Sequence, residues 1–197
     1  MTVMVEPQRR LSDDELLEVA RLLNLNLEVT KEGIIRLMTP THGKSSRANG
    51  SITQQLGNWA EARGGYFYDS NTWFVLPDGS RLGPDAAYIT PARIASVPAD
   101  AFNKFPEVCP NFVIELMSES DSVAETTAKM QNWIENGVEL GWMIDPYRRH
   151  GYLHAVYVFA PDSSHFGEPH KDVDVIHGYG PVAGFELDLA KVWKCYE

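Results

Sequence analysis

The sequence predicts an α/β protein with a mixed central β-sheet flanked by helices. The strongest evidence is a strand–helix–strand unit over residues 111–144, because two parallel strands need a long crossover connection of this kind. A second observation is a capped amphipathic helix that begins near Ser12. The third is a series of short strand patterns, bounded by turn residues, through the middle of the chain. This alternation of helices and strands excludes an all-β architecture.

Length and composition predict a single domain over residues 1–197, with a core over about 11–193. The chain has 197 residues, 44% of them hydrophobic, and a chain of this size buries roughly 70% of its unfolded surface. Cys109 and Cys195 match no metal-ligand spacing and are predicted to be free thiols in a reducing compartment. The first residues are too acidic for a signal peptide, and no apolar run is long enough to span a membrane. We therefore expect a cytoplasmic protein.

The first part of the chain predicts two helices and several short strands. Ser12 and Glu15 have the spacing of a capping box, and Leu11 and Leu16 have that of a hydrophobic staple. The later elements are strands at 27–29 and 34–38, a helix with apolar positions Ala48, Ile52, Leu56 and Trp59 that Gly64 can end, and strands at 66–70 and 73–76.

The second part begins with a turn at residues 77–80, where Pro-Asp-Gly-Ser has strong turn chemistry. The expected elements are a continuous strand at 81–89, an apolar strand at 111–118, a helix at 122–136 ended by Gly137, a buried strand at 140–144, its partner at 152–159, a polar loop at 162–174, and a short strand with a closing helix within 175–192.

Two acidic residues interrupt these apolar strands. Glu115 lies within Phe-Val-Ile-Glu-Leu, and Asp85 precedes Ala-Ala-Tyr-Ile. A carboxylate in such a position is costly unless it is paired, bound to a metal, or at a strand end that reaches solvent. Two acids on neighbouring strands repel each other, and a divalent cation between them removes that repulsion. Magnesium takes one or two carboxylates plus waters and phosphate oxygens, so Asp85 and Glu115 are candidate Mg²⁺ ligands, with Mn²⁺ as a substitute.

Other metal chemistry has little support. His150 and His154 show an HxxxH spacing, but it falls across a turn and a strand and not on one face of a helix. Asp78 also follows a proline, although Gly79 and Ser80 mark it as part of a β-turn. The sequence therefore does not favour zinc.

Taken together, the motifs resemble those of the PD-(D/E)XK nuclease superfamily and, within it, the Uma2 family of proposed bacterial restriction endonucleases. The resemblance spans residues 11–193 and is carried by Asp69-Ser70-Asn71-Thr72, Leu76-Pro77-Asp78-Gly79-Ser80, Gly83-Pro84-Asp85-Ala86-Ala87-Tyr88-Ile89, Phe112-Val113-Ile114-Glu115-Leu116-Met117-Ser118, residues 129–137 (KMQNWIENG) and Gly141-Trp142-Met143-Ile144-Asp145-Pro146. It implies a restriction-endonuclease-like fold and metal-dependent hydrolysis of DNA, with Asp85, Glu115 and the Leu116 carbonyl as metal ligands.

The chain departs from the superfamily pattern at one catalytic position. The motif places a lysine two residues after the second acid, where this sequence has Met117. The resemblance implies that Lys129, in the following helix, takes this role. Trp133 lies one helical turn later, so the two side chains share a side of the helix. No role transfers to His42 or Asn49, and Asp69 is either an additional acid near the site or part of a turn.

Three functions remain open. The first is a Mg²⁺-dependent endodeoxyribonuclease, with Lys44, Arg47 and Arg81 among the candidate DNA contacts and with a homodimer expected if both strands are cut. The second is a nuclease-fold interaction or regulatory protein with weak catalysis, which the net charge of −10 and the missing lysine favour. The third is a glycosidase that uses Asp85 and Glu115 as acid and base, but the aromatic residues of a sugar platform are missing near them.

Overall fold

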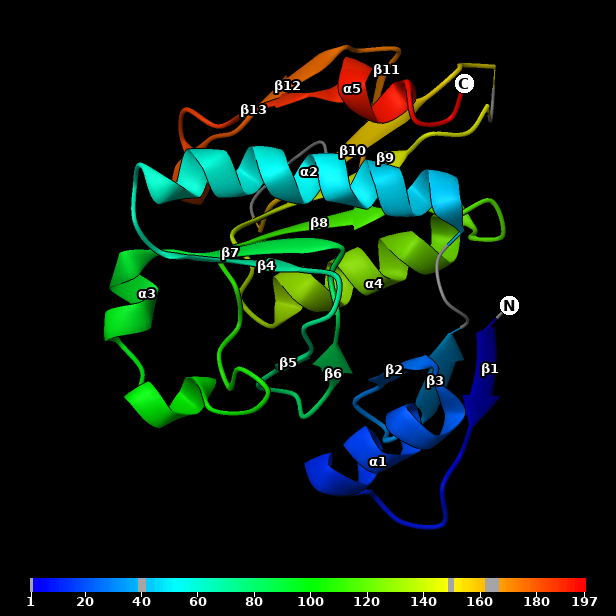
Figure 1. The fold of residues 1–197 in the computed structure, drawn as a ribbon, viewed down its shortest axis with the longest axis vertical. Helices are drawn as coiled ribbons and strands as arrows, with labels where there is room; N and C mark the ends of the chain where they lie inside the picture. The colour runs from blue at the N-terminus through cyan, green and yellow to red at the C-terminus, as the bar shows by residue number, and fades with distance from the viewer. Residues whose placement is uncertain (1, 39–41, 149–150, 162–166) are drawn as a thin grey trace.

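The computed structural model describes residues 2–38, 42–148, 151–161 and 167–197. Within these ranges the chain forms a six-stranded sheet, a five-stranded sheet and a two-stranded hairpin (Figure 1). The helices are α1 (Asp13–Leu23), α2 (Gly43–Glu61), α3 (Pro91–Ala95), α4 (Val123–Glu135) and α5 (Leu189–Trp193). The strands are β1 (Thr2–Val5), β2 (Asn26–Val29), β3 (Ile35–Met38), β4 (Tyr66–Asp69), β5 (Phe74–Val75), β6 (Arg81–Leu82), β7 (Ala86–Ile89), β8 (Phe112–Leu116), β9 (Leu140–Asp145), β10 (Ala155–Phe159), β11 (Pro169–Lys171), β12 (Val175–His177) and β13 (Glu186–Asp188).

The six-stranded sheet is mixed, as the sequence predicts. Its strand order is β11-β10-β9-β8-β7-β4, and β8 and β9 pair in parallel while the other neighbours are antiparallel. Helix α4 makes the crossover between β8 and β9. It begins at the cap Ser122, whose hydroxyl accepts from the Glu125 N–H, and ends before Gly137, which has a φ of 112°. The predicted strand–helix–strand unit is therefore confirmed.

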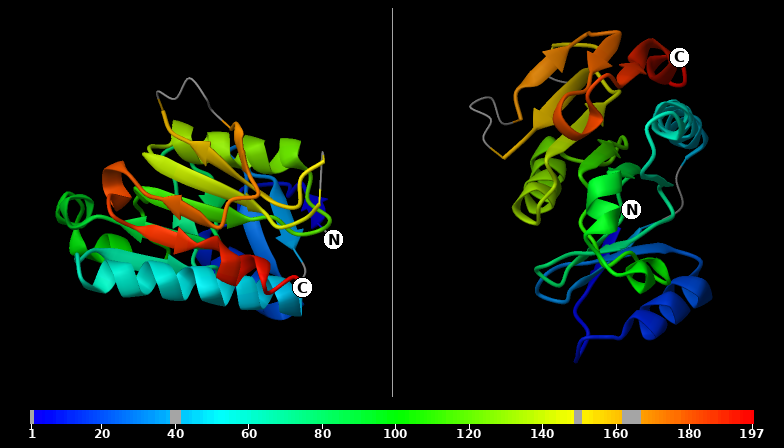
Figure 2. Two further views of the ribbon diagram at one scale, coloured as in Figure 1. Left: turned by 90° about the horizontal axis from the view of Figure 1, so that it is seen from above. Right: turned by 90° about the vertical axis from the view of Figure 1, so that its left-hand side faces the viewer.

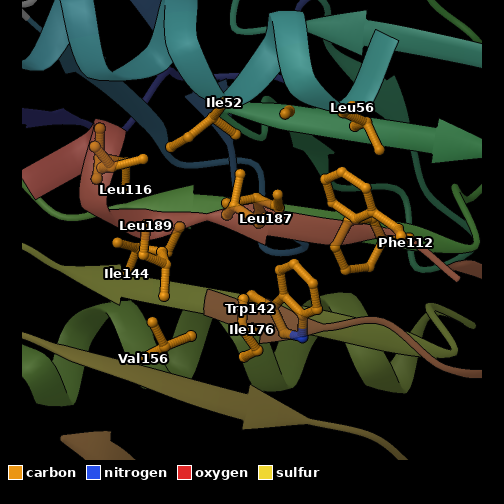
Figure 3. Packing of buried hydrophobic residues seen from close by; sticks show 14 of the residues in the cluster. Ile52, Leu56, Phe112, Leu116, Trp142, Ile144, Val156, Ile176, Leu187 and Leu189 are labelled. Carbon is orange, nitrogen blue, oxygen red and sulfur yellow. The ribbon is translucent and has the colours of Figure 1, made fainter. Parts of the chain in front are cut away.

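Both faces of this sheet are buried. Even-numbered side chains of β8, such as Phe112 and Leu116, pack against α2, the β12–β13 hairpin and α5 (Figure 3). Odd-numbered side chains, such as Val113, face α4, where Met130 and Trp133 are fully buried. Figure 2 shows the same layers, with α2 and α4 on opposite sides of the sheet. This alternation follows from the two-residue repeat of a strand and places Glu115 on the side of α4.

The first three strands of the chain build the second sheet together with β5 and β6, in the order β1-β3-β2-β6-β5. Helix α1 covers it through Leu16, and its predicted capping box between Ser12 and Glu15 is present. Strand β1 pairs with β3 and was not predicted, because its exposed residues Val3, Met4 and Val5 carry no alternating pattern. None of the helices in the described ranges is long and apolar enough to cross a membrane.

Two predicted elements differ from the structure. The strand expected at 81–89 is split, because β6 joins the five-stranded sheet while β7 joins the six-stranded sheet. Pro84 lacks an N–H for a sheet ladder, so the chain leaves one sheet and enters the other across residues 83–85. The loop expected at 162–174 contains β11, which pairs with β10 at the sheet edge; residues 162–166 lie outside the described ranges.

Candidate active site

Asp85 lies at the junction between the two sheets, directly before β7. Both of its carboxylate oxygens accept hydrogen bonds: Oδ1 from Asn49 Nδ2 at 2.6 Å and Oδ2 from the Leu116 N–H at 2.7 Å. The side chain is half-buried between the start of α2 and the end of β8. Burial raises the pKa of the Asp85 carboxyl, and the Leu116 N–H, the Lys129 ammonium and Asn49 partly oppose that rise.

Glu115 lies on the neighbouring strand β8 and is only 5% exposed. Trp133 donates its indole N–H to Oε1 at 2.8 Å, and the Lys129 ammonium lies 2.9 Å from each carboxylate oxygen. Burial raises the pKa of Glu115, an effect that the Lys129 charge opposes and the nearby Asp85 charge strengthens. The two acids are therefore electrostatically coupled, as expected of side chains from adjacent strands.

Lys129 points inward from α4. Its ammonium donates to the Gly83 carbonyl at 2.8 Å and to Glu115, and its side chain is 13% exposed. Burial by itself lowers the pKa of Lys129, but the charges of Glu115 and Glu28 raise it more, so the ammonium stays charged. Trp133 stands one turn later on the same side of the helix, as the i, i+4 spacing predicts, and both side chains bind Glu115.

Sequence reasoning missed two residues at this site: Asn49, which binds Asp85, and Glu28. Glu28 lies on β2 of the five-stranded sheet, is 1% exposed, and places Oε1 2.6 Å from the Lys129 ammonium. The Gly83 N–H also donates to Oε1 at 3.2 Å, and Arg36 lies 3.8 Å from Oε2. One feature of the sequence could have indicated Glu28: it is an acid between Leu27 and Val29 in an apolar strand, just as Glu115 interrupts an apolar strand.

The donor set suits a hard divalent cation. Asp85, directly before β7, and Glu115, on β8, supply two carboxylates. Mg²⁺ commonly takes only one or two carboxylates and completes its shell with water and phosphate oxygens. The burial that raises the pKa of both carboxyls is a cost that a cation between them would remove. Within the described residues no group of three or more His, Cys, Asp or Glu side chains could hold a metal ion. The residues present fit Mg²⁺ or Mn²⁺ better than zinc.

Asp69 lies at the end of β4 and participates in a turn. Its Oδ1 accepts from the Asn71 N–H at 3.0 Å, and Oδ2 accepts from Asn71 Nδ2 at 3.2 Å. It also lines an open groove of about 360 Å³ between α2 and β4. Asn49 lies on the same groove and reaches Asp85, so the groove leads toward the acidic pair.

The three basic residues proposed as DNA contacts have different environments. Lys44 donates to the main-chain carbonyls of Tyr196 and Glu197, at 2.6 and 3.2 Å. Arg81 pairs with Asp13 at 2.6 Å and is mostly buried. Arg47 is exposed near the start of α2. Of the three, Arg47 is the one whose guanidinium faces solvent without a partner among the described residues.

In the part of the chain that the structure describes, the cysteines and histidines form no metal-binding cluster. Cys109 and Cys195 are free and buried, as predicted. The stacking partner of His154 is Trp193, with ring centroids 4.2 Å apart. His150 lies outside the described residues, so the HxxxH pattern has no structural counterpart to compare.

Comparison with known proteins identifies the family and the fold of the chain. The model of the Uma2 family, described as "Putative restriction endonuclease", matches residues 13–188. The chain belongs to the Uma2 family. A solved structure described as a "putative nuclease belonging to DUF820", from Anabaena variabilis ATCC 29413, is similar to this Uma2 chain with a TM-score of 0.70 and 19% identity, over 89% of this chain and 97% of that one. The fold is therefore restriction-endonuclease-like. No curated protein matches.

In this Uma2 chain a lysine from another element lies beside Glu115. Met117 stands where the superfamily motif has lysine, and it is fully buried against the α4 side of the sheet. The cation beside Glu115 comes from α4 instead, through Lys129. Two acids and a lysine therefore lie together in space, although position 117 holds no lysine.

Proposed function

We propose that this Uma2 protein is a divalent-metal-dependent endonuclease that hydrolyses phosphodiester bonds in DNA. The observation that carries the proposal is the Lys129 ammonium 2.9 Å from Glu115, in the same site as Asp85, in a chain whose linear motif lacks that lysine. A structural ion pair would not require an acid from the neighbouring strand as well. Family membership supports DNA as the substrate class.

Each residue has a distinct role in this proposal. Asp85 and Glu115 hold Mg²⁺ or Mn²⁺, with the Leu116 carbonyl as a third protein ligand. When bound, the cation polarises the scissile phosphate and lowers the pKa of an attacking water. Lys129 orients that water and stabilises the negative charge that develops on the phosphate. The hydrogen bonds from Asn49 and the Leu116 N–H favour the ionised form of Asp85 and fix the direction of its side chain.

The test is cleavage of supercoiled plasmid DNA with Mg²⁺ or Mn²⁺, with EDTA as the metal-free control. We expect Asp85→Asn, Glu115→Gln and Lys129→Met to lower the rate by about 10²–10⁴-fold. The matched control is Glu139→Gln, because Glu139 also binds a cation, Arg93, but lies away from the site. Wild-type activity in Asp85→Asn, or equal activity in EDTA, would contradict the proposal.

The alternative is a nuclease-fold interaction protein with weak catalysis. The net charge of −10 and the engagement of Lys44 and Arg81 by other protein groups favour it. The two functions differ in metal binding, since a ligand that binds the native state raises the melting temperature by mass action. A rise with Mn²⁺ that is lost in Glu115→Gln supports the enzyme, whereas no rise supports the alternative.

Two further features belong to the enzyme proposal. Cutting both strands of a duplex with one site per chain favours a homodimer, which sedimentation of the protein with and without DNA would test. The free buried cysteines are consistent with a cytoplasmic location, because thiols persist in a reducing compartment.

A further inference from the structure

The Lys129 ammonium is held by three acceptors that come from three separate segments. It carries three protons, and its partners are Glu115 on β8, the carbonyl of Gly83 at the sheet junction, and Glu28 on β2. The Glu28 contact, at 2.6 Å, is the shortest of the three. All three donors of the ammonium are therefore occupied.

Glu28 is also tied to the segment that carries Asp85. Its Oε1 accepts from the Gly83 N–H at 3.2 Å while it contacts the ammonium, and the Gly83 carbonyl accepts from the same ammonium. Each of these three residues therefore contacts the other two: Glu28, Gly83 and Lys129. Gly83 lies two residues before Asp85, so these contacts also hold the segment that carries the acid. A buried carboxylate is costly unless it is paired in this way, and Glu28 is 1% exposed.

These contacts have a consequence when Glu115 serves as a cation ligand. With a cation bound, the charge of Glu115 would be shared with it, and the hydrogen bond from Lys129 to Glu115 would weaken. Glu28 and the Gly83 carbonyl can keep two protons of the ammonium in place, which leaves the third free to bind a water or a phosphate oxygen at the site. In that cation-bound state, removal of Glu28 would leave the Gly83 carbonyl as the single fixed partner of the flexible lysine side chain.

We propose that Glu28 is a positioning residue that holds Lys129 in its catalytic place, so that the five-stranded sheet forms part of the active site. The inference rests on the proposed nuclease function for its kinetic consequence. The placement of the ammonium by Glu28 is a separate claim that can be tested without any cleavage.

The test uses three variants of the full chain. Glu28→Leu keeps the volume but removes the acceptor, Glu28→Gln keeps an acceptor but removes the charge, and Asp13→Asn is the matched control. Asp13 also joins the first part of the chain to β6, through Arg81 at 2.6 Å, but it does not contact Lys129. Plasmid cleavage is measured over a range of DNA concentrations, and the ¹⁵N–¹H signal of the Lys129 ammonium, assigned by its loss in Lys129→Met, is measured without metal.

We expect Glu28→Leu to lower the cleavage rate at saturating DNA by about 10–100-fold, the scale of a misplaced catalytic group. The DNA concentration for half-maximal rate should change less than about threefold, because Lys129, and not DNA, is the partner of Glu28. Glu28→Gln should fall between Glu28→Leu and wild type, and Asp13→Asn should match wild type. The slowly exchanging Lys129 ammonium signal should be lost in Glu28→Leu. In a Lys129→Met background, Glu28→Leu should cause no further loss of cleavage.

Several results would overturn the positioning role. A folded Glu28→Leu protein with the wild-type rate and an intact Lys129 signal would do so, as would a further loss of cleavage in the Lys129→Met background. If Glu28→Leu does not fold, the cleavage rate of Glu28→Gln is the test instead. A wild-type cleavage rate in Glu28→Gln would then contradict the positioning role. If the wild-type protein does not cleave DNA, the proposed function fails, and the ammonium signal alone decides whether Glu28 positions Lys129.

Discussion

Replacing Lys129 by methionine tests how the buried charges of the site are balanced. The change removes an ammonium that lies 2.6 Å from Glu28 and 2.9 Å from Glu115, whose side chains are 2% and 6% exposed. Removing one partner of a buried ion pair costs about 3–5 kcal/mol, because the other charge stays buried. For a chain of this length, each 1 kcal/mol lowers the melting temperature by about 2–4 °C, so we expect a fall of roughly 6–20 °C at alkaline pH.

The size of this loss should depend on pH. Burial holds the pKa of Glu115 above its ordinary value, and the Lys129 charge opposes that rise, so the variant has a still higher Glu115 pKa. A carboxyl whose pKa is higher in the folded than in the unfolded state makes stability fall as the pH rises. The loss of unfolding free energy in Lys129→Met, relative to wild type, should therefore be larger at pH 9 than at pH 6. At pH 6 Glu115 of the variant keeps its proton, so no uncompensated charge is buried at that residue.

The assay is urea and thermal unfolding of both proteins at pH 6 and pH 9. The control is Lys104→Met, which removes an ammonium from an exposed pair with Asp14 at 2.8 Å and should change stability little at either pH. A deficit that is equal at the two pH values, or no larger than that of the control, would refute the charge balance described for this site.

Four further outcomes follow from the packing, the hydrogen bonds and the burial of a thiol. Gly65→Ala should lower the free energy of unfolding by about 2–4 kcal/mol, because φ is +90° and a Cβ would lie 2.4 Å from the Ile89 carbonyl oxygen. Gly50→Ala should raise the free energy of unfolding by about 0.5–1 kcal/mol, because Gly50 lies within α2 and has open space around it. Trp133→Phe should lower the free energy of unfolding by about 1–3 kcal/mol in urea unfolding, since Glu115 Oε1 loses a donor at 2.8 Å. Burial raises the pKa of Cys109 to about 12, so iodoacetamide at pH 8 should modify Cys109 only after unfolding, as mass spectrometry would show.

The parts of the fold that local patterns encode were predictable. The capping box of Ser12 and Glu15 and the β8–α4–β9 unit depend on residues close in sequence, and both appear as predicted. The position of Lys129 was predictable for a related reason. Its spacing from Trp133 places both side chains on one side of α4, and the buried face of that helix must meet β8.

What the sequence did not reveal depends on contacts between distant segments. Glu28 lies on β2 of the five-stranded sheet, whereas Lys129 lies on α4, which packs on the six-stranded sheet. No spacing rule connects two residues so far apart in the sequence, although both contact Gly83. The split between β6 and β7 was missed because residues 81–89 carry a continuous strand pattern, and the partner strands that separate them belong to different sheets. The contact between Asn49 and Asp85 could not be predicted either, because it depends on how α2 packs beside β7.

The junction between the two sheets explains why the candidate site and the fold depend on each other. Within residues 83–85 the chain leaves β6 and enters β7, and this short segment supplies a carbonyl to Lys129, an N–H to Glu28 and the Asp85 carboxylate. Lys129 connects the same segment to Glu115 on β8. A shift of the five-stranded sheet against the six-stranded sheet would therefore move the lysine and an acid together. Because the proposed cleavage requires these groups to stay aligned, the contacts that fix the junction should matter for activity as much as for stability.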